Sequence, residues 1–192
     1  MANEPEAGEL LPPGCGLWLG WIITSIIGSA SGWALGWWAS MIAPGMISTA
    51  IIGSTMGIFL GSMQWLVIRG IVDRSGWWPL ASVFGWGAGF SIGVEIAQRL
   101  GLSDIMFGLV VGVLIGTLLG LSQWVVLHRQ VTKAGWWIPA STFAWASSLI
   151  YYRPGITGVG AVYGILSGIV TGIVLLWLFY RPVPDYKVEI DA

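Results

Sequence analysis

Long stretches without a charged residue constrain the fold of this chain more than any other feature. The longest runs from Leu17 to Ile68, and four more cover residues 75–94, 105–127, 134–152 and 154–180. Only 9% of all residues are charged, against roughly 25% in a typical soluble domain. A soluble globule needs a polar surface around its core, and this chain has too few polar residues to build one. The sequence therefore predicts a multi-pass membrane protein.

The remaining composition excludes several classes of protein. A single Cys excludes a secreted disulfide scaffold, and a net charge of −1 excludes a nucleic-acid binder with a basic face. A mean hydropathy of +0.81 excludes a disordered chain. Glycine and tryptophan are both abundant, at 29 and 14 residues, and both recur in regular patterns.

Six membrane-spanning helices account for the uncharged stretches. A helix needs about 20 apolar residues to cross the hydrocarbon layer, so the first stretch is too long for one span and divides at Pro44 and Gly45. Helices satisfy their own backbone polar groups, as lipid requires. We expect an all-α, single membrane domain over residues 17–181. Its spans are predicted at 17–41, 46–69, 77–98, 105–128, 136–152 and 156–180.

The basic residues of the loops predict the orientation. With six spans, one side of the membrane holds both termini and the second and fourth loops. The Lys and Arg residues on that side are Arg69, Arg74, Arg129, Lys133, Arg181 and Lys187, against Arg99 and Arg153 on the other. The positive-inside rule then places both tails, residues 1–16 and 182–192, in the cytoplasm. The first tail has no basic residue, so we expect it to be retained rather than cleaved as a signal peptide.

The middle of the chain contains an internal repeat. The segments 57–86 and 116–145 match without gaps, with four tryptophan pairs aligned. The first and last spans match more weakly, with Gly28 placed on Ala81 and Gly164 placed on Gly112. We therefore predict three parallel helical hairpins related by approximate threefold pseudosymmetry about the membrane normal. Their ranges are 17–69, 77–129 and 136–181.

Glycines recur every four residues along five of the six predicted spans, so each row occupies one helix face. The rows are Gly28, Gly32 and Gly36; Gly53, Gly57 and Gly61; Gly85, Gly89 and Gly93; Gly112, Gly116 and Gly120; and Gly160, Gly164, Gly168 and Gly172, while the fifth span has Ala140, Ala144 and Ser148. Small-residue rows let helix backbones approach closely in lipid. They predict glycine-zipper packing among the six helices. Alternatively, some rows face outward, toward a partner subunit or a flat ligand such as a pigment ring or a sterol-like lipid.

Tryptophans fall at two depths. Those at helix starts are typical of interfacial anchors, and they are Trp18, Trp21, Trp77, Trp78, Trp136 and Trp137. Trp86 and Trp145 lie nine residues beyond Trp77 and Trp136, which is about 13 Å deeper along a helix. Lipid tails offer no hydrogen-bond acceptor. We therefore expect each deep indole to bond a backbone carbonyl, a hydroxyl or a ligand.

Gln64 and Gln123 are the clearest polar residues inside the predicted spans. A buried amide is destabilising by several kcal/mol unless it is hydrogen-bonded. We expect each to bond the backbone or a tryptophan of a neighbouring helix. The alternative is ligation of a pigment magnesium or of a lipid headgroup.

Two titratable residues are further candidates for ligand binding. His128 has no Cys or carboxylate at metal-ligand spacing, so no metal site is predicted. It lies either at the membrane interface beside Arg129 or as the axial ligand of a porphyrin-type ring. Glu95 stands four residues before Arg99, the spacing of a helical ion pair. Otherwise Glu95 is the best candidate for a proton or cation site.

No catalytic residues are predicted. The chain offers no nucleophile–base set, no paired acids and no phosphate loop, and its glycines lack the strand-turn-helix context of a dinucleotide site. Ser54, Thr55 and Thr117 are almost the only polar residues near the predicted midplane, which argues against an ion-coupled transporter. We therefore expect a protein that is not an enzyme.

The repeated segment resembles uncharacterised Gly/Trp-rich multi-pass membrane proteins of cyanobacteria and Chloroflexi-type bacteria. The residues that carry the likeness are Gly61, Gln64, Trp65, Arg69, Gly76, Trp77, Trp78 and Ala81, and again Gly120, Gln123, Trp124, Gly135, Trp136, Trp137 and Ala140, with His128 in place of Arg69. The resemblance implies a bacterial inner or thylakoid membrane. Because such hosts include phototrophs, it also implies chlorophyll, carotenoid or lipid as candidate ligands, and it implies no reaction.

These observations favour a non-enzymatic accessory or scaffold subunit that packs against other membrane proteins, with a photosynthetic complex as one candidate partner. One alternative is a small-solute channel or carrier with a path along the pseudo-threefold axis, and another is a self-assembling homo-oligomer. The direction of Gln64 and Gln123 discriminates between the first two. A central water-filled space favours transport, whereas burial between helices favours a subunit.

Overall fold

The computed structural model describes residues 14–150 and 159–179, and every regular element in these ranges is helical. The long elements are α1 (Cys15–Ser40), α2 (Gly45–Ile68), α3 (Trp78–Arg99), α4 (Asp104–Leu127), α5 (Trp137–Leu149) and α6 (Val159–Phe179). Short 3₁₀ turns, η1 (Ser75–Trp77) and η2 (Ala134–Trp136), precede α3 and α5.

The boundary between α1 and α2 lies at the predicted break. Pro44 caps α2 in an extended conformation, and Gly45 has φ of +62°. Glycine adopts this left-handed conformation without the steric cost that a side chain would impose. The chain therefore reverses here over the short segment 41–44, and the uncharged stretch from Leu17 to Ile68 forms two antiparallel helices.

Five helical segments in the described part of the chain are long and apolar enough to cross a membrane: α1, α2, α3 with its 3₁₀ turn, α4 and α6. These are the properties of an integral membrane protein. The fifth predicted span differs, because α5 has only 13 residues and ends at Leu149, giving a helix of about 20 Å. The rest of that span, residues 151 and 152, lies outside the described residues.

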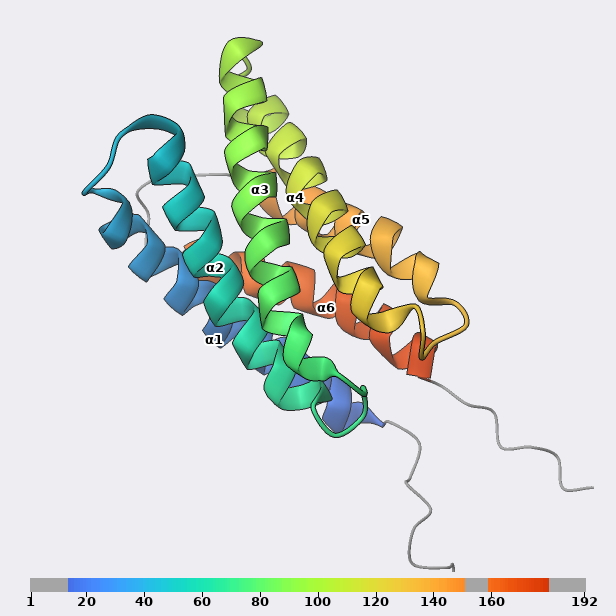
Figure 1. The fold of residues 1–192 in the computed structure, drawn as a ribbon. Helices are drawn as coiled ribbons and strands as arrows, with labels where there is room; N and C mark the ends of the chain where they lie inside the picture. Colours follow the sequence, from blue (N-terminus) through green and yellow to red (C-terminus); the bar gives the residue numbers. More distant parts are fainter. Residues whose placement is uncertain (1–13, 151–158, 180–192) are drawn as a thin grey trace, which may run out of the picture.

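The six helices form a closed ring. Each packs against the next in the chain, and α6 packs against both α5 and α1 (Figure 1). Because α1, α3 and α5 alternate with the other helices, side chains from these three meet only at the centre of the ring. Trp21, Trp78 and Trp137, all close to helix starts, make such contacts. The three odd-numbered helices therefore begin at the same end.

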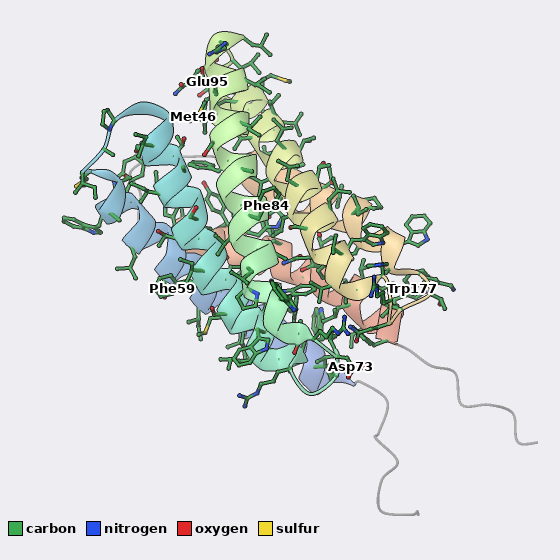
Figure 2. The ribbon with its side chains drawn as sticks, viewed as in Figure 1. Met46, Phe59, Asp73, Phe84, Glu95 and Trp177 are labelled. Carbon is green, nitrogen blue, oxygen red and sulfur yellow. The ribbon has the colours of Figure 1, made fainter. Side chains whose placement is uncertain are left out.

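The two ends of the ring differ in charge. The end at which α1, α3 and α5 begin carries Arg69, Arg74, Arg129 and Lys133 and is here called the basic end. Figure 2 shows Asp73 and Trp177 at this end, and Met46 and Glu95 at the other. The second and fourth loops lie together at the basic end, where the Gln130 side chain bonds the backbone of Asp73.

Candidate functional site

Three tryptophans close the axis of the ring near the basic end. Trp21, Trp78 and Trp137 are at most 1% exposed. Their ring centroids lie 5.6 to 6.0 Å apart in edge-to-face arrangements, the geometry that aromatic quadrupoles favour. One indole comes from each of the three hairpins, and together they fill the space between α1, α3 and α5.

This position contradicts the interpretation of all helix-start tryptophans as interfacial anchors. Trp78 and Trp137 are buried, whereas their predecessors Trp77 and Trp136 are 62% and 63% exposed. Consecutive residues of a helix are about 100° apart around its axis, so the two members of each pair cannot face the same way. Only one member of each pair is placed to act as an anchor.

Gln64 lies between the first two hairpins, and both ends of its amide are bonded. Trp78 donates its Nε1–H to Gln64 Oε1 at 3.2 Å, and Gln64 Nε2 donates to Ser25 Oγ at 3.2 Å. Gln64 is 6% exposed. A tryptophan of the next helix is one of the partners expected for this buried amide.

Gln123 repeats this arrangement between the second and third hairpins. Trp137 donates its Nε1–H to Gln123 Oε1 at 2.9 Å, and Gln123 Nε2 donates to Ser82 Oγ at 3.0 Å. Ser82 in turn donates to the carbonyl oxygen of Trp78 at 2.9 Å. Each glutamine therefore links the tryptophan of the following helix to the serine of the preceding one.

Thr171 occupies the third position, between α6 and α1. Trp21 donates its Nε1–H to Thr171 Oγ1 at 2.9 Å, and the threonine hydroxyl donates to the carbonyl oxygen of Ser167 at 2.6 Å. The serine that corresponds to Ser25 and Ser82 is Ser141, and its buried hydroxyl has no hydrogen-bond partner. We call these three Trp–Gln/Thr–Ser sets the axial network, complete at two positions and incomplete at the third.

The glycine rows lie in the contacts between adjacent helices. An ideal Cβ built on any glycine of the predicted rows would lie within 3.1 Å of a heavy atom of a neighbouring helix. On Gly116 it would be 2.5 Å from the carbonyl oxygen of Ser141, and on Gly164 it would be 2.5 Å from that of Ser25. The rows are therefore used between helices, and they bring the axial serines close to the facing backbones. Gly108, outside the predicted rows, meets the carbonyl of Leu149 in the same way.

Similar contacts relate the outer spans to the middle spans in a register that differs from the sequence match. Ser25 and Ser82 make the same contacts in successive hairpins, and so do Gly116 and Gly164. The sequence match places Gly164 on Gly112 instead, about one helical turn away, and the two registers of the first span differ by the same amount. Glycines recur every four residues, so a shift of about one turn aligns glycine with glycine equally well. Only the contacts distinguish the two registers.

Trp86 and Trp145 pack against one another deeper in the ring, with ring centroids 4.6 Å apart at 84°. Both are at most 2% exposed. The expected acceptor for Trp86 is absent, because its buried Nε1 has no hydrogen-bond partner. Its ring also packs against Phe90, so the indole lies against other aromatic side chains rather than beside a polar group.

His128 and Glu95 lie at opposite ends of the ring. His128 is exposed, with Nδ1 2.9 Å from the carbonyl oxygen of Val125 and its ring 4.9 Å from that of Trp124. Glu95 Oε1 accepts from Arg99 Nε at 2.6 Å, so the predicted helical ion pair is present. Within the described ranges, no three His, Cys, Asp or Glu side chains group together as metal ligands would.

A groove between α5 and α6 opens on the outer surface of the ring, and sequence reasoning missed it. Its volume is about 620 Å³. The lining residues are Lys133, Trp136, Pro139, Ala140, Phe143, Val170, Val174 and Trp177. The signal that could have indicated it is the replacement of the glycine row by Ala144 and Ser148 in α5.

Comparison with known proteins finds no matching family model, no similar curated protein and no similar solved structure. The resemblance to Gly/Trp-rich membrane proteins of cyanobacteria and Chloroflexi-type bacteria therefore stays a prediction. So do the host membrane and the pigment ligands that this resemblance implies.

Proposed function

We propose that this chain is a non-enzymatic integral membrane subunit that packs through its outer surface against other membrane proteins. The observation that best supports this proposal is the filled axis, in which Gln64 and Gln123 form hydrogen bonds with tryptophans and serines of the same chain. The outside of the ring, by contrast, offers large exposed apolar side chains on all six helices. Examples are Leu19, Ile58, Phe84, Leu121, Phe143 and Ile173.

We further infer that the ring consists of three like-oriented hairpin repeats about a pseudo-threefold axis. In support, one tryptophan from each hairpin joins the axial cluster, and each bonds a side chain of the preceding hairpin in the ring. The same symmetry brings a glycine of each even-numbered helix against an axial serine. Positive charge in the loops favours a cytoplasmic basic end, with both termini on that side.

A channel or carrier along the axis receives less support. Such a path needs a continuous polar or water-filled space. The axis instead contains three indole rings with centroids 5.6 to 6.0 Å apart. The burial of Gln64 and Gln123 between helices also favours the subunit over the transporter.

Site-specific photocrosslinking in native membranes tests the proposal. A photoreactive phenylalanine analogue at Phe84, which is 66% exposed, should crosslink to a defined membrane protein. The same analogue at Phe90, on the same helix but 1% exposed, should crosslink only within the chain. Phe84 adducts that contain lipid alone, together with a colourless and partner-free monomer after mild extraction, would refute the proposal.

The pigment ligand is tested on the same preparation. An absorption spectrum and mass spectrometry of the material extracted with the protein identify bound chlorophyll or carotenoid. Flux of small solutes into liposomes that contain the purified protein tests the channel alternative, for which the closed axis predicts no increase over empty liposomes.

A further inference from the structure

The groove between α5 and α6 runs inward from the basic end of the ring. On α5 and η2 its lining extends from Trp136 to Phe143, and on α6 from Trp177 back to Val170. Seven residues of helix correspond to about 10 Å, so the groove continues for about that distance below the loops. Apart from Lys133, its lining side chains are apolar.

Side-chain size distinguishes the helix contact beside the groove from the matching contact in the preceding hairpin. In α3, Gly89 lies against α4, where an ideal Cβ would be 2.6 Å from the Cα of Ile115, and Gly85 packs against Leu119 in the same way. At the corresponding positions of the repeat, Ala144 and Ser148 carry side chains where α3 has none. We expect these side chains to hold α5 farther from α6 than α3 is from α4, and so to leave space on the outer side.

A cation stands at the mouth of the groove. Lys133 is exposed, and its Nζ lies 4.8 Å from the ring centroid of Trp177, within the range of a cation–π interaction. Trp136 packs edge to face against Trp177, with centroids 6.5 Å apart. Among the described residues that line the groove, Lys133 is the one that is charged. The groove therefore favours a molecule with a negative charge at the mouth and an apolar part below it.

We propose that this groove binds an anionic phospholipid, with the phosphate beside Lys133 and an acyl chain along α5 and α6. Interfacial tryptophans sit at the depth of lipid headgroups, and basic side chains near the membrane surface attract anionic lipids. The chemistry therefore favours a chain-bearing anion over a flat, uncharged ring. This inference rests on the membrane location of the chain and is independent of its role as a subunit.

Native mass spectrometry of the full chain tests the site. The protein is purified in a mild detergent, loaded with either phosphatidylglycerol or phosphatidylcholine, and delipidated in steps. We expect one phosphatidylglycerol per chain to remain under conditions that remove phosphatidylcholine. The Lys133→Gln variant should retain phosphatidylglycerol about fivefold more weakly, as expected for the loss of one basic residue at the membrane surface.

Two further variants separate the groove from general surface charge. Arg74 is the counterpart of Lys133 in the preceding repeat, in the loop before the closely packed α3–α4 pair, so Arg74→Gln should leave retention unchanged. Ala140→Phe should fill the groove and abolish retention, and thermal unfolding followed by circular dichroism shows whether it folds. Where Ala140→Phe does not fold, Trp177→Leu removes the aromatic wall at the mouth and should also reduce retention.

Several results would overturn the inference. These are equal retention of the two lipids, equal losses in Lys133→Gln and Arg74→Gln, or full retention in the variant that fills the groove. Inorganic phosphate that binds as tightly as the lipid would reveal an anion site without a chain-binding groove. If the chain forms a dimer and the dimer does not retain the lipid, the groove is occupied by a second copy of the chain instead. Lipid retention with no protein partner would refute the subunit role alone.

Discussion

The hairpin α3–α4 and the hairpin α5–α6, which we propose to be repeats, differ in their packing. In the first, Gly85 and Gly89 allow close backbone contact, and Gln123 completes its part of the axial network. In the second, α5 has Ala144 at the corresponding position, and α6 offers Thr171 in place of a glutamine. This second hairpin also has a groove on its outer side and an unbonded serine, Ser141, on its inner side.

Close helix packing and the hydrogen bonding of buried polar side chains are therefore coupled in this ring. A glutamine can reach both partners because a glycine three residues earlier, Gly61 or Gly120, brings the facing helix near. Helix α6 keeps that glycine, Gly168, but its threonine is too short to bond Ser141 as well as Trp21. The third hairpin is therefore expected to be the least stable part of the ring.

Removing the close approach should have the largest effect. The double variant Gly57→Leu and Gly116→Leu places side chains where even a Cβ on Gly116 would be 2.5 Å from a backbone oxygen. We expect no assembled monomer after mild extraction, measured by size-exclusion chromatography. Gly135→Leu is the matched control, because a Cβ there meets nothing within 4 Å. Normal assembly of the double variant would show that these rows do not hold the helices together.

The next largest effect should come from cutting the axial network. Gln123→Leu leaves the Trp137 N–H without an acceptor and removes a donor to Ser82, with an expected loss of about 2 kcal/mol in unfolding free energy. Thr171→Val leaves the Trp21 N–H without an acceptor and removes a local donor to the Ser167 carbonyl oxygen within α6. It should cost about 1 kcal/mol. Unfolding by sodium dodecyl sulfate in mixed micelles measures both. Equal losses would contradict the distinction between complete and incomplete positions.

Completing the third position should stabilise the ring. In Thr171→Gln, the longer side chain can accept from Trp21 and donate to Ser141, as Gln64 and Gln123 do with their partners. We expect a gain of about 1 kcal/mol in the same unfolding assay. Combining this change with Ser141→Ala should cancel part of the gain. A destabilised Thr171→Gln variant with Ser141 intact would refute the proposed equivalence of the three positions.

The smallest expected effect is that of Ser141→Ala alone. Because the Ser141 hydroxyl is buried and unpartnered, its removal should be neutral or stabilise by about 0.5 kcal/mol. Ser82→Ala removes a hydroxyl that accepts a hydrogen bond from Gln123 and donates one to the carbonyl oxygen of Trp78. It should lower the unfolding free energy by about 1 kcal/mol. The two unfolding curves show whether Ser141→Ala is more stable than Ser82→Ala, as the comparison of the two hairpins predicts. Because each change removes only a hydroxyl, this test disturbs the packing least.

Much of the helical architecture follows from local patterns. The uncharged stretches located each helix to within a few residues over the part of the chain that the structure describes, and the four-residue glycine spacing identified the packing faces. The depth of Gln64 and Gln123 similarly indicated buried, bonded amides. These features depend on residue type and on spacing along one helix, and both can be read without knowing what lies opposite.

Other features depend on what faces what across the ring. Contacts between helices decide whether Trp77 or Trp78 turns inward, and they decide which register relates α1 to α3. They also leave the Trp86 indole without a hydrogen-bond acceptor. A period of four residues maps onto itself after about one helical turn, so the pattern alone leaves the register undefined.

The linear chain thus carries enough information to specify apolar helices, small-residue faces and a few polar residues within them, because burial in lipid acts on each segment separately. Ring closure, the meeting of three indoles on the axis and the opening beside Lys133 arise only when all six helices are packed together. Each of these depends on which side chains face one another across the helix contacts. One example is the methyl group of Ala144, where α3 has only the hydrogen of Gly85.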